Sequence, residues 1–293
     1  MFSRRVAGVV MVGAMLIPLV GAGGAAAAKP VPPPVGERAL TPQEQAEADA
    51  RLAAAEAYVA SADARAAELV TLACVTPLAD GTEGTTEDAT TSGCSTPQGF
   101  LAVEARDQDK GTYCGPAVGQ VIANYAWAMR AGANKYTQAK IAGWMQTDIK
   151  GMTNAPELED GLELSTAGAP RRPAAWNWVV AALFDSDRDG QVGDQLHAML
   201  RSNVSNSKMP LAVPVKPHDN SDRFHLSSWS KPVNSPGHWI AAYGWVGLWT
   251  GTDAARLYYT DSSRDEGGST GKFWDPVRHI AQMIMDHTQR LVW

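Results

Sequence analysis

The predicted fold is organised around the segment Gln108-Asp-Lys-Gly-Thr-Tyr-Cys114-Gly-Pro-Ala-Val-Gly-Gln-Val-Ile-Ala-Asn-Tyr125. It predicts a loop that turns directly into a helix at the cysteine, because apolar residues recur at steps of three and four between residues 116 and 130. Pro116 stands just inside the start of this helix, where its missing N–H would have no intrahelical partner. Cys114 would therefore lie at the positive end of the helix dipole, which favours the nucleophilic thiolate. This cysteine is a candidate catalytic nucleophile.

Two later apolar runs are predicted to bring a base to that cysteine. Residues 237–245 read as a buried strand with His238 at its entrance, and residues 257–263 as a second strand with Asp261 at its exit. A short connection containing Gly251 separates them, so the two strands are expected to pair as a hairpin. Antiparallel pairing would make His238 and Asp261 neighbours, with the carboxylate orienting the imidazole toward Cys114. The nearby Asp253 and Asp265 are alternatives to Asp261.

These segments together resemble the C39-like cysteine peptidases of the papain-like superfamily, through the Cys114-Gly-Pro-Ala helix start, the Gly-His238-Trp strand and the Thr-Asp261 strand end. The resemblance covers residues 100–293. It implies an α+β, papain-like cysteine peptidase fold, in which an N-terminal helical part carries the cysteine and an antiparallel sheet carries the histidine and the aspartate. It also implies that Gln108 donates to the oxyanion. The best-known members are fused to a membrane ABC exporter and cut leader peptides, and this chain shows no such fusion, so the resemblance implies the catalytic class rather than that substrate.

The activity expected from this resemblance is hydrolysis of peptide bonds by a secreted cysteine peptidase. Its partner would be a peptide or protein substrate, and catalysis would need no cofactor. Two other classes stay open: an acyl transferase or cell-wall amidase that uses the same triad, and a non-catalytic secreted binding protein that keeps the fold. The oligomeric state is not predicted.

Residues 1–28 have the layout of a secretory signal peptide. Arg4 and Arg5 precede an apolar run from Val6 to Val20 and a tract of small residues. A membrane anchor is the alternative, but the apolar run is shorter than the ~20 residues that a spanning helix needs. Removal of the two arginines changes the formal net charge from −6 to −8. An acidic mature chain without blocks of lysine and arginine disfavours nucleic acid and anionic membranes as partners, and we expect an extracellular protein.

The next segments predict an N-terminal extension before the catalytic domain. Residues 29–40 read as a Pro-rich linker, and residues 41–99 as an Ala-rich helix with a disulfide loop. Thr41-Pro-Gln-Glu44 is a capping-box pattern, so the helix should begin at residue 42, and it is expected to continue to about Val70. This extension is interpreted either as a structural helix, which the sequence favours, or as an inhibitory pro-segment.

Three cysteines allow three single-disulfide pairings, each of which leaves one thiol unpaired. A bridge between Cys74 and Cys94 would close a loop of about 20 residues, worth on the order of 3 kcal/mol, and would leave Cys114 free. A pairing that consumes Cys114 is the alternative, and it would imply an inactive structural protein.

An aspartate-rich segment, Asp185-Ser-Asp187-Arg-Asp189-Gly-Gln191, resembles the first half of an EF-hand loop. The twelfth position, which should be a bidentate glutamate, is Leu196, so the match is incomplete. Two interpretations remain open: a weak structural calcium site that includes Gln191, and a solvated polar turn. The other histidines lack ligand spacing, so a zinc hydrolase is poorly supported.

Several further predicted elements bear less directly on function. Trp176 and Trp178 suggest an extended segment that packs in the core or lines a substrate groove. Residues 217–236 read as a polar surface loop beside the site. The remaining expectations are helices starting after Thr137, near Pro156 and after Asp194, a strand at Leu211–Val215, and a closing helix within Val277 to Leu291.

Overall fold

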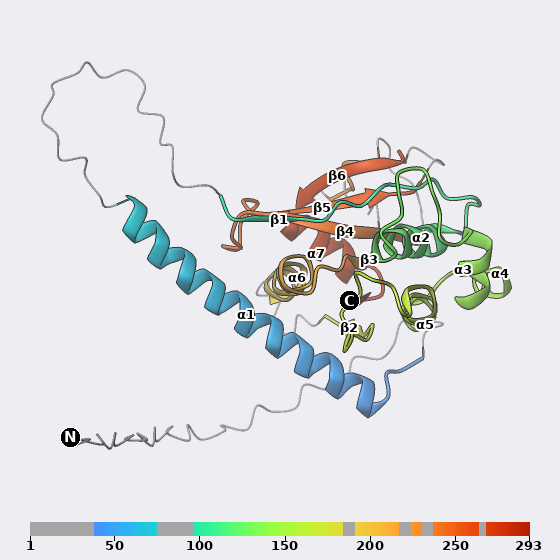
Figure 1. Ribbon diagram of the computed structural model, residues 1–293, viewed down its shortest axis with the longest axis horizontal. Helices are drawn as coiled ribbons and strands as arrows, with labels where there is room; N and C mark the ends of the chain where they lie inside the picture. Colours follow the sequence, from blue (N-terminus) through green and yellow to red (C-terminus); the bar gives the residue numbers. More distant parts are fainter. Residues whose placement is uncertain (1–37, 75–95, 184–190, 217–223, 230–236, 264–267) are drawn as a thin grey trace, which may run out of the picture. The chain divides into compact units, whose positions relative to one another are not determined.

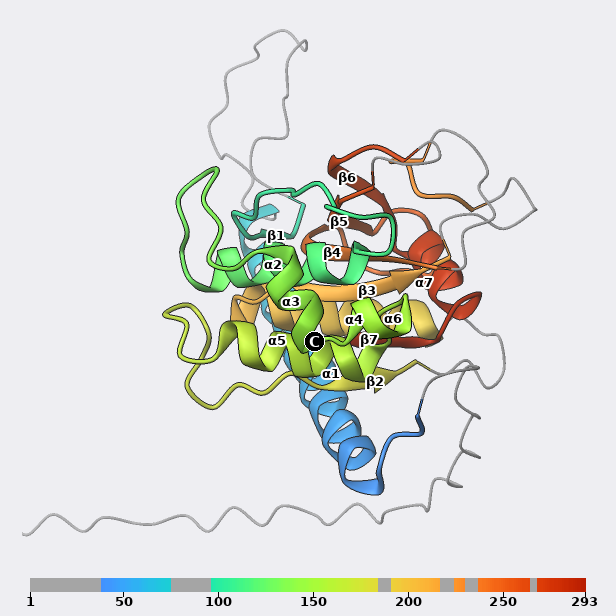
Figure 2. The same cartoon turned by 90° about the vertical axis from the view of Figure 1, so that its right-hand side faces the viewer.

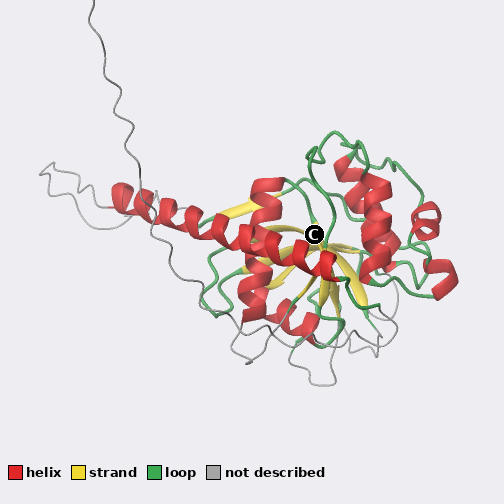
Figure 3. Ribbon diagram, turned by 90° about the horizontal axis from the view of Figure 1, so that it is seen from below, coloured by secondary structure: helices red, strands yellow, loops and turns green. Residues whose placement is uncertain are grey.

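The computed structural model describes residues 38–74, 96–183, 191–216, 224–229, 237–263 and 268–293. These residues form an α+β fold around an antiparallel sheet with the strand order β2-β7-β3-β4-β5-β6, and β1 pairs with β4. The strands are β1 (Gln98–Phe100), β2 (Val180–Ala182), β3 (Leu211–Val215), β4 (His238–Val246), β5 (Arg256–Asp261), β6 (Gly271–Pro276) and β7 (Arg290–Val292). Figure 3 shows the strands in the middle of the fold with helices on either side.

The helices form two groups. One group, α2 (Cys114–Ala126), α3 (Gln138–Trp144), α4 (Thr147–Lys150) and α5 (Ala155–Thr166), gathers beside β4 (Figures 1 and 2). The other consists of α6 (Gln191–Arg201), the π-helix η1 (Ser202–Ser207) and α7 (Val277–Met285); α6 packs on β4, and α7 packs on β3 and β5. The long helix α1 (Pro42–Cys74) precedes both groups.

The starts of α1, α2 and α3 follow their local sequence signals, whereas α6 begins at Gln191 and includes Asp194, which was expected to precede it. At α1 the Glu44 N–H donates to Thr41 Oγ1 at 3.2 Å, and the Thr41 N–H donates to Glu44 Oε2 at 2.6 Å, which confirms the capping box. At α3 the Thr137 side chain accepts from the Lys140 N–H, as expected of an N-cap. α2 begins at Cys114, as predicted, but it ends at Ala126 rather than near residue 130. The left-handed conformation of Ala128, with φ 53°, breaks it there.

The strand predictions were right in the middle of the sheet and wrong at the C-terminus. β3 has the predicted bounds, and β4 and β5 form the predicted antiparallel hairpin. The segment expected to close the chain with a helix instead gives strand β6, the shorter helix α7 and strand β7. A left-handed turn at Gln289, with φ 58°, separates α7 from β7. β7 fits between β2 and β3, where Leu291 and Val292 are fully buried, and this tertiary burial outweighs the helical pattern.

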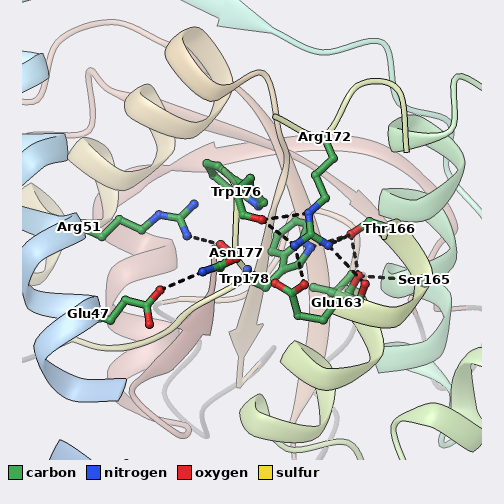
Figure 4. A network of polar contacts seen from close by, with 10 residues as sticks. Glu47, Arg51, Glu163, Ser165, Thr166, Arg172, Trp176, Asn177 and Trp178 are labelled. Atoms are coloured by element: carbon green, nitrogen blue, oxygen red, sulfur yellow. Dashed lines mark hydrogen bonds and ion pairs between the residues drawn. The ribbon is translucent and has the colours of Figure 1, made fainter. Parts of the chain in front are cut away.

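Helix α1 docks against the β2 end of the sheet, and Figure 4 shows part of this interface. The Arg51 guanidinium lies 3.7 Å from the centroid of the Trp176 ring and 4.8 Å from that of Trp293. It also donates to the Asn177 carbonyl at 2.5 Å. Burial lowers its pKa to about 10, against the raising effect of the nearby Glu47 and Glu163. β2 is an edge strand, separated from β4 by β7 and β3, so α1 docks away from the strand that carries His238.

The same contacts settle the role of the two tryptophans that precede β2. Trp176 and Trp178 are both buried and meet edge to face at 5.9 Å. The Trp178 indole donates to Thr166 Oγ1 at 2.9 Å, and its backbone N–H donates to Glu163. The alternative in which these residues line a substrate groove is therefore wrong, because they pack between α5 and the α1 interface (Figure 4).

We expect Arg51→Ala to lower the free energy of unfolding by about 2 kcal/mol or more, because a cation held against aromatic rings away from water is lost. The matched control is Arg65→Ala on the exposed part of the same helix, expected within about 0.5 kcal/mol of the wild type. Urea unfolding followed by tryptophan fluorescence measures both. Equal effects of the two substitutions would show that Arg51 does not anchor the helix.

Candidate functional site

Cys114 opens helix α2, at the place where the helical group meets the sheet. A Cβ on the next residue, Gly115, would lie 2.5 Å from Oγ1 of Thr153, so only glycine allows this close approach to the start of α5. The Thr153 carbonyl in turn accepts the indole N–H of Trp239, the second residue of β4, at 2.8 Å. The start of α2 is therefore packed against Thr153, and Thr153 is in turn bonded to β4. Cys114 is half-buried, and its thiol is free, in contrast to the alternative in which it is disulfide-bonded.

His238 and Asp261 are brought together by the β4–β5 hairpin. Ala241 pairs with Thr260, and because side chains alternate along strands, His238 and Asp261 project from the same face. His238 Nε2 lies 2.8 Å from Asp261 Oδ1, which confirms that the two are neighbours. The exposed fractions are 4% for His238 and 0% for Asp261, so this pair is shielded from water.

The carboxylate of Asp261 is held by four donors. Oδ1 faces His238 Nε2 and accepts the Ser263 N–H, each at 2.8 Å. Oδ2 accepts the Ser228 hydroxyl at 2.6 Å and the Trp229 indole N–H at 2.9 Å. The Trp229 ring also meets the His238 ring edge to face, with centroids 5.4 Å apart. These contacts fix both the position and the ionised form of the carboxylate.

Ser228 and Trp229 are site residues that the sequence did not predict. They belong to the segment expected to be a surface loop, yet both are buried, as is Leu226, so for these three residues that expectation was wrong. The cause is tertiary: Trp229 bridges to Gly268, and the Ser269 N–H donates to the Ser228 carbonyl. A tryptophan in a polar stretch was the available signal, because a large aromatic ring with one N–H donor usually becomes buried against an acceptor.

The charges of the site favour a thiolate beside an imidazolium. Burial alone would raise the pKa of the Cys114 thiol, but the hydrogen bond and positive charge of His238, with the N–H groups of Trp239 and Gly115, lower it below its ordinary value. Burial alone would lower the pKa of His238, but the Asp261 carboxylate and the Cys114 sulfur raise it to about 10. The pKa of Asp261 is lowered, because the His238 charge and the hydrogen bonds from His238, Ser228 and the Ser263 N–H outweigh its burial. Since Nε2 faces Asp261, Nδ1 remains for the sulfur.

Gln108 lies between the cysteine loop and the end of β5. Its backbone N–H donates to the Ser262 carbonyl at 3.0 Å, and its Oε1 accepts from the Ser262 hydroxyl at 3.4 Å. The side-chain amide donates to the Gly111 carbonyl at 3.1 Å. An amide NH₂ has two hydrogens, and this contact uses one. The residue is thus attached to the neighbour of Asp261 and to the loop that leads into Cys114.

A second glutamine, Gln138, holds the chain on both sides of Gln108 and was not predicted. Its amide donates to the Asp107 carbonyl at 2.6 Å, and its Oε1 accepts the Asp109 N–H at 2.8 Å. It also donates to Gln120, whose own amide is bound to the Tyr136 carbonyl. Gln120 therefore belongs to this support rather than to the site. No sequence pattern pointed to Gln138, because its contacts join separate segments of the chain.

The competing residues have other partners. Asp253 pairs with Arg278 at 2.9 Å, so it does not orient His238, while Asp265 lies outside the described residues. His197 is buried in α6, where its Nε2 lies 3.2 Å from the Gly247 carbonyl, and burial lowers its pKa to about 4. Asp261 is therefore the carboxylate that binds and orients the His238 imidazole.

Several predictions fall on residues that the structure does not describe. They are the signal peptide at residues 1–28, the calcium ligands Asp185, Asp187 and Asp189 and the side chain of Gln191, and the Cys74–Cys94 disulfide, of which Cys94 and the side chain of Cys74 are undescribed. In the described ranges, no group of three or more His, Cys, Asp or Glu side chains could hold a metal ion. Within those same ranges, no helix combines the length and apolarity needed to cross a bilayer.

The chain matches no protein-family model and no curated protein sequence. A free thiol at a helix N-terminus, an imidazole bonded to it and a buried carboxylate behind the imidazole form a nucleophile, a base and an orienting group. This arrangement suits nucleophilic attack on an acyl carbon.

Proposed function

We propose that the protein is a secreted cysteine peptidase that hydrolyses peptide bonds with Cys114 as nucleophile, His238 as base and Asp261 as orienting carboxylate. The observation that carries the proposal is the shared imidazole, which bonds to the Asp261 carboxylate at 2.8 Å and to the Cys114 thiol. The order along the chain, Gln108 before Cys114, His238 and Asp261, is that of the C39-like cysteine peptidases. A helical part with the cysteine and an antiparallel sheet with the other two residues also supports a papain-like fold.

The proposed reaction has two steps. The Cys114 thiolate attacks the carbonyl carbon of the scissile bond, and the backbone N–H of Cys114 and the Gln108 amide stabilise the oxyanion. His238 then gives its Nδ1 proton to the leaving amine, so the C–N bond breaks and a thioester remains on Cys114. In the second step His238 takes a proton from water, the resulting hydroxide attacks the thioester, and the carboxylic acid and the thiolate are released. Asp261 keeps the imidazole ring in place throughout.

Cleavage of an unfolded protein substrate, followed through the appearance of new amino termini, tests this proposal. The wild type is expected to cleave, and both Cys114→Ala and prior alkylation of Cys114 are expected to abolish cleavage. An added amine acceptor distinguishes hydrolysis from acyl transfer, because a transferase would form mainly the new amide and a hydrolase mainly the free acid. Cleavage that persists in Cys114→Ala would overturn the proposal.

Gln108→Ala is expected to lower kcat by about 10²- to 10³-fold, the usual effect of losing one oxyanion donor. The pH profile of Cys114 alkylation should stay unchanged, since the thiolate depends on His238 rather than on Gln108. Gln282→Ala is the matched control, because this exposed glutamine on α7 donates only locally, to Asp286 at 2.9 Å. If Gln108→Ala kept full turnover, the oxyanion role would be wrong while the nucleophile assignment would stand.

A further inference from the structure

A second buried carboxylate, Asp275 on β6, lies behind the site and has no part in the mechanism above. Its Oδ2 accepts the Ser227 N–H at 3.0 Å and lies 2.7 Å from the Tyr259 hydroxyl. Burial raises its pKa, partly offset by these hydrogen bonds and by the nearby charge of His279. Asp275 also lines a cavity of about 520 Å³ together with His225, Lys272 and His279. This carboxylate thus has titratable neighbours on one side and a hydroxyl chain on the other.

Tyr259 links this carboxylate to the site. The residue is fully buried on β5, and its hydroxyl lies 3.3 Å from the hydroxyls of both Ser227 and Ser228. Ser228 Oγ in turn donates to Asp261 Oδ2 at 2.6 Å. Each hydroxyl has one hydrogen to donate. All the hydrogen bonds can therefore point toward Asp261 only if Asp275 is protonated and donates a hydrogen bond to the Tyr259 oxygen. In that arrangement Tyr259 donates to Ser228, and Ser228 donates to Asp261.

We propose that Tyr259 is a positioning residue, whose hydroxyl, held by Asp275, keeps the Ser228 hydroxyl directed at Asp261 and thereby sets the reactivity of Cys114. The effect on turnover rests on the proposed function, whereas the effect on the thiol does not. Without the tyrosine hydroxyl, Ser228 loses a neighbour that fixes its rotation, and the ionised form of Asp261 is less well stabilised. A carboxylate that is held less firmly gives the imidazolium a less well-aligned counter-charge, and a less stable imidazolium raises the pKa of the Cys114 thiol.

Tyr259→Phe tests the inference through the pH midpoint of Cys114 alkylation by iodoacetamide. We expect the midpoint to rise by about 0.5 to 1 pH unit, which corresponds to the net free energy of one hydrogen bond. Turnover near neutral pH should fall about 3- to 10-fold. The control is Tyr258→Phe, the adjacent half-buried tyrosine, whose ring packs against Phe100 with centroids 4.9 Å apart. It should leave the midpoint unchanged. A merely structural role of Tyr259 would lower stability without moving the midpoint.

Ser228→Ala should raise the midpoint at least as much as Tyr259→Phe, and the double variant should add nothing to Ser228→Ala alone, because the tyrosine acts through the serine. Additive shifts would overturn the inference. Should Tyr259→Phe not fold, Asp275→Ala replaces it and should also raise the midpoint, because the Tyr259 hydroxyl loses the group that holds it. If His238→Ala moves the midpoint and Tyr259→Phe does not, the positioning role fails and the proposed function stands. If neither moves it, the proposed function itself fails.

Discussion

His238→Ala is expected to lower turnover by about 10⁴-fold or more, because the nucleophile loses its base and the leaving amine loses its proton donor. The same substitution should return the Cys114 thiol toward an ordinary cysteine, with an alkylation midpoint near or above pH ~8.5. Two features of the wild type lead to this result: the lowered thiol pKa depends chiefly on the hydrogen bond and charge of His238, and burial on its own acts in the opposite direction. Rates of iodoacetamide labelling across pH measure the change.

His197→Ala is the matched control for this experiment. It also removes a buried imidazole, but one that lies in α6 against the Gly247 carbonyl. In this variant the pH profile of Cys114 alkylation should match that of the wild type, even if the stability of the protein falls. An ordinary thiol profile in the wild type itself would contradict the thiolate–imidazolium pair, and with it the enzyme proposal.

Asp261→Ala is expected to lower the free energy of unfolding by about 3 to 5 kcal/mol, because it leaves the buried His238 without its counter-charge. Turnover should fall by about 10³- to 10⁴-fold, since the imidazole loses its orienting group. The control is Asp253→Ala, which breaks an exposed pair with Arg278 and should change stability by about 1 kcal/mol or less. Chemical unfolding gives both values. A loss of unfolding free energy at Asp261 no larger than that at Asp253 would show that the Asp261 carboxylate does not stabilise the buried imidazolium.

Asp261→Asn gives a finer test of the four donors. With its amide nitrogen in place of Oδ2, the new side chain would face the Ser228 hydroxyl and the Trp229 indole. The hydroxyl can rotate to accept, but an indole N–H can only donate. One buried donor is therefore left unpaired, at about 1 to 3 kcal/mol. Adding Trp229→Phe to Asp261→Asn should recover part of this loss, and no recovery would mean that the indole is not bound as described.

The stability of the site should depend on pH in two opposite ways. The pKa of Asp261 is lowered on folding, so its contribution is present above its ordinary value of about 4 and disappears as pH falls through the lowered pKa. The pKa of His238 is raised to about 10, so its contribution is complete below its ordinary value of about 6.5 and is lost as pH rises toward 10. We expect His238→Ala to flatten the alkaline decline, and a decline of unchanged slope would contradict the raised pKa.

Much of the local structure could be predicted because its causes are local. The capping box at Thr41 and Glu44, the cap at Thr137 and the helix start at Cys114 depend on residues within one turn of each other. The hairpin that joins His238 to Asp261 followed from two apolar runs and a short connection. For the same reason, the three residues proposed for catalysis could be named from the order of their motifs.

The rest depended on contacts between distant segments. Strand β7 formed where a helix was expected, because burial between β2 and β3 outweighed the helical pattern of its neighbours. The donors Ser228 and Trp229 and the support of Gln108 by Gln138 likewise join segments far apart in the chain. Local patterns thus sufficed to place the starts of α1, α2 and α3, to pair β4 with β5 and to select the candidate catalytic residues. The polar groups that hold these candidate residues followed from the folded chain alone, because a buried polar group pairs with whichever partner the fold brings next to it.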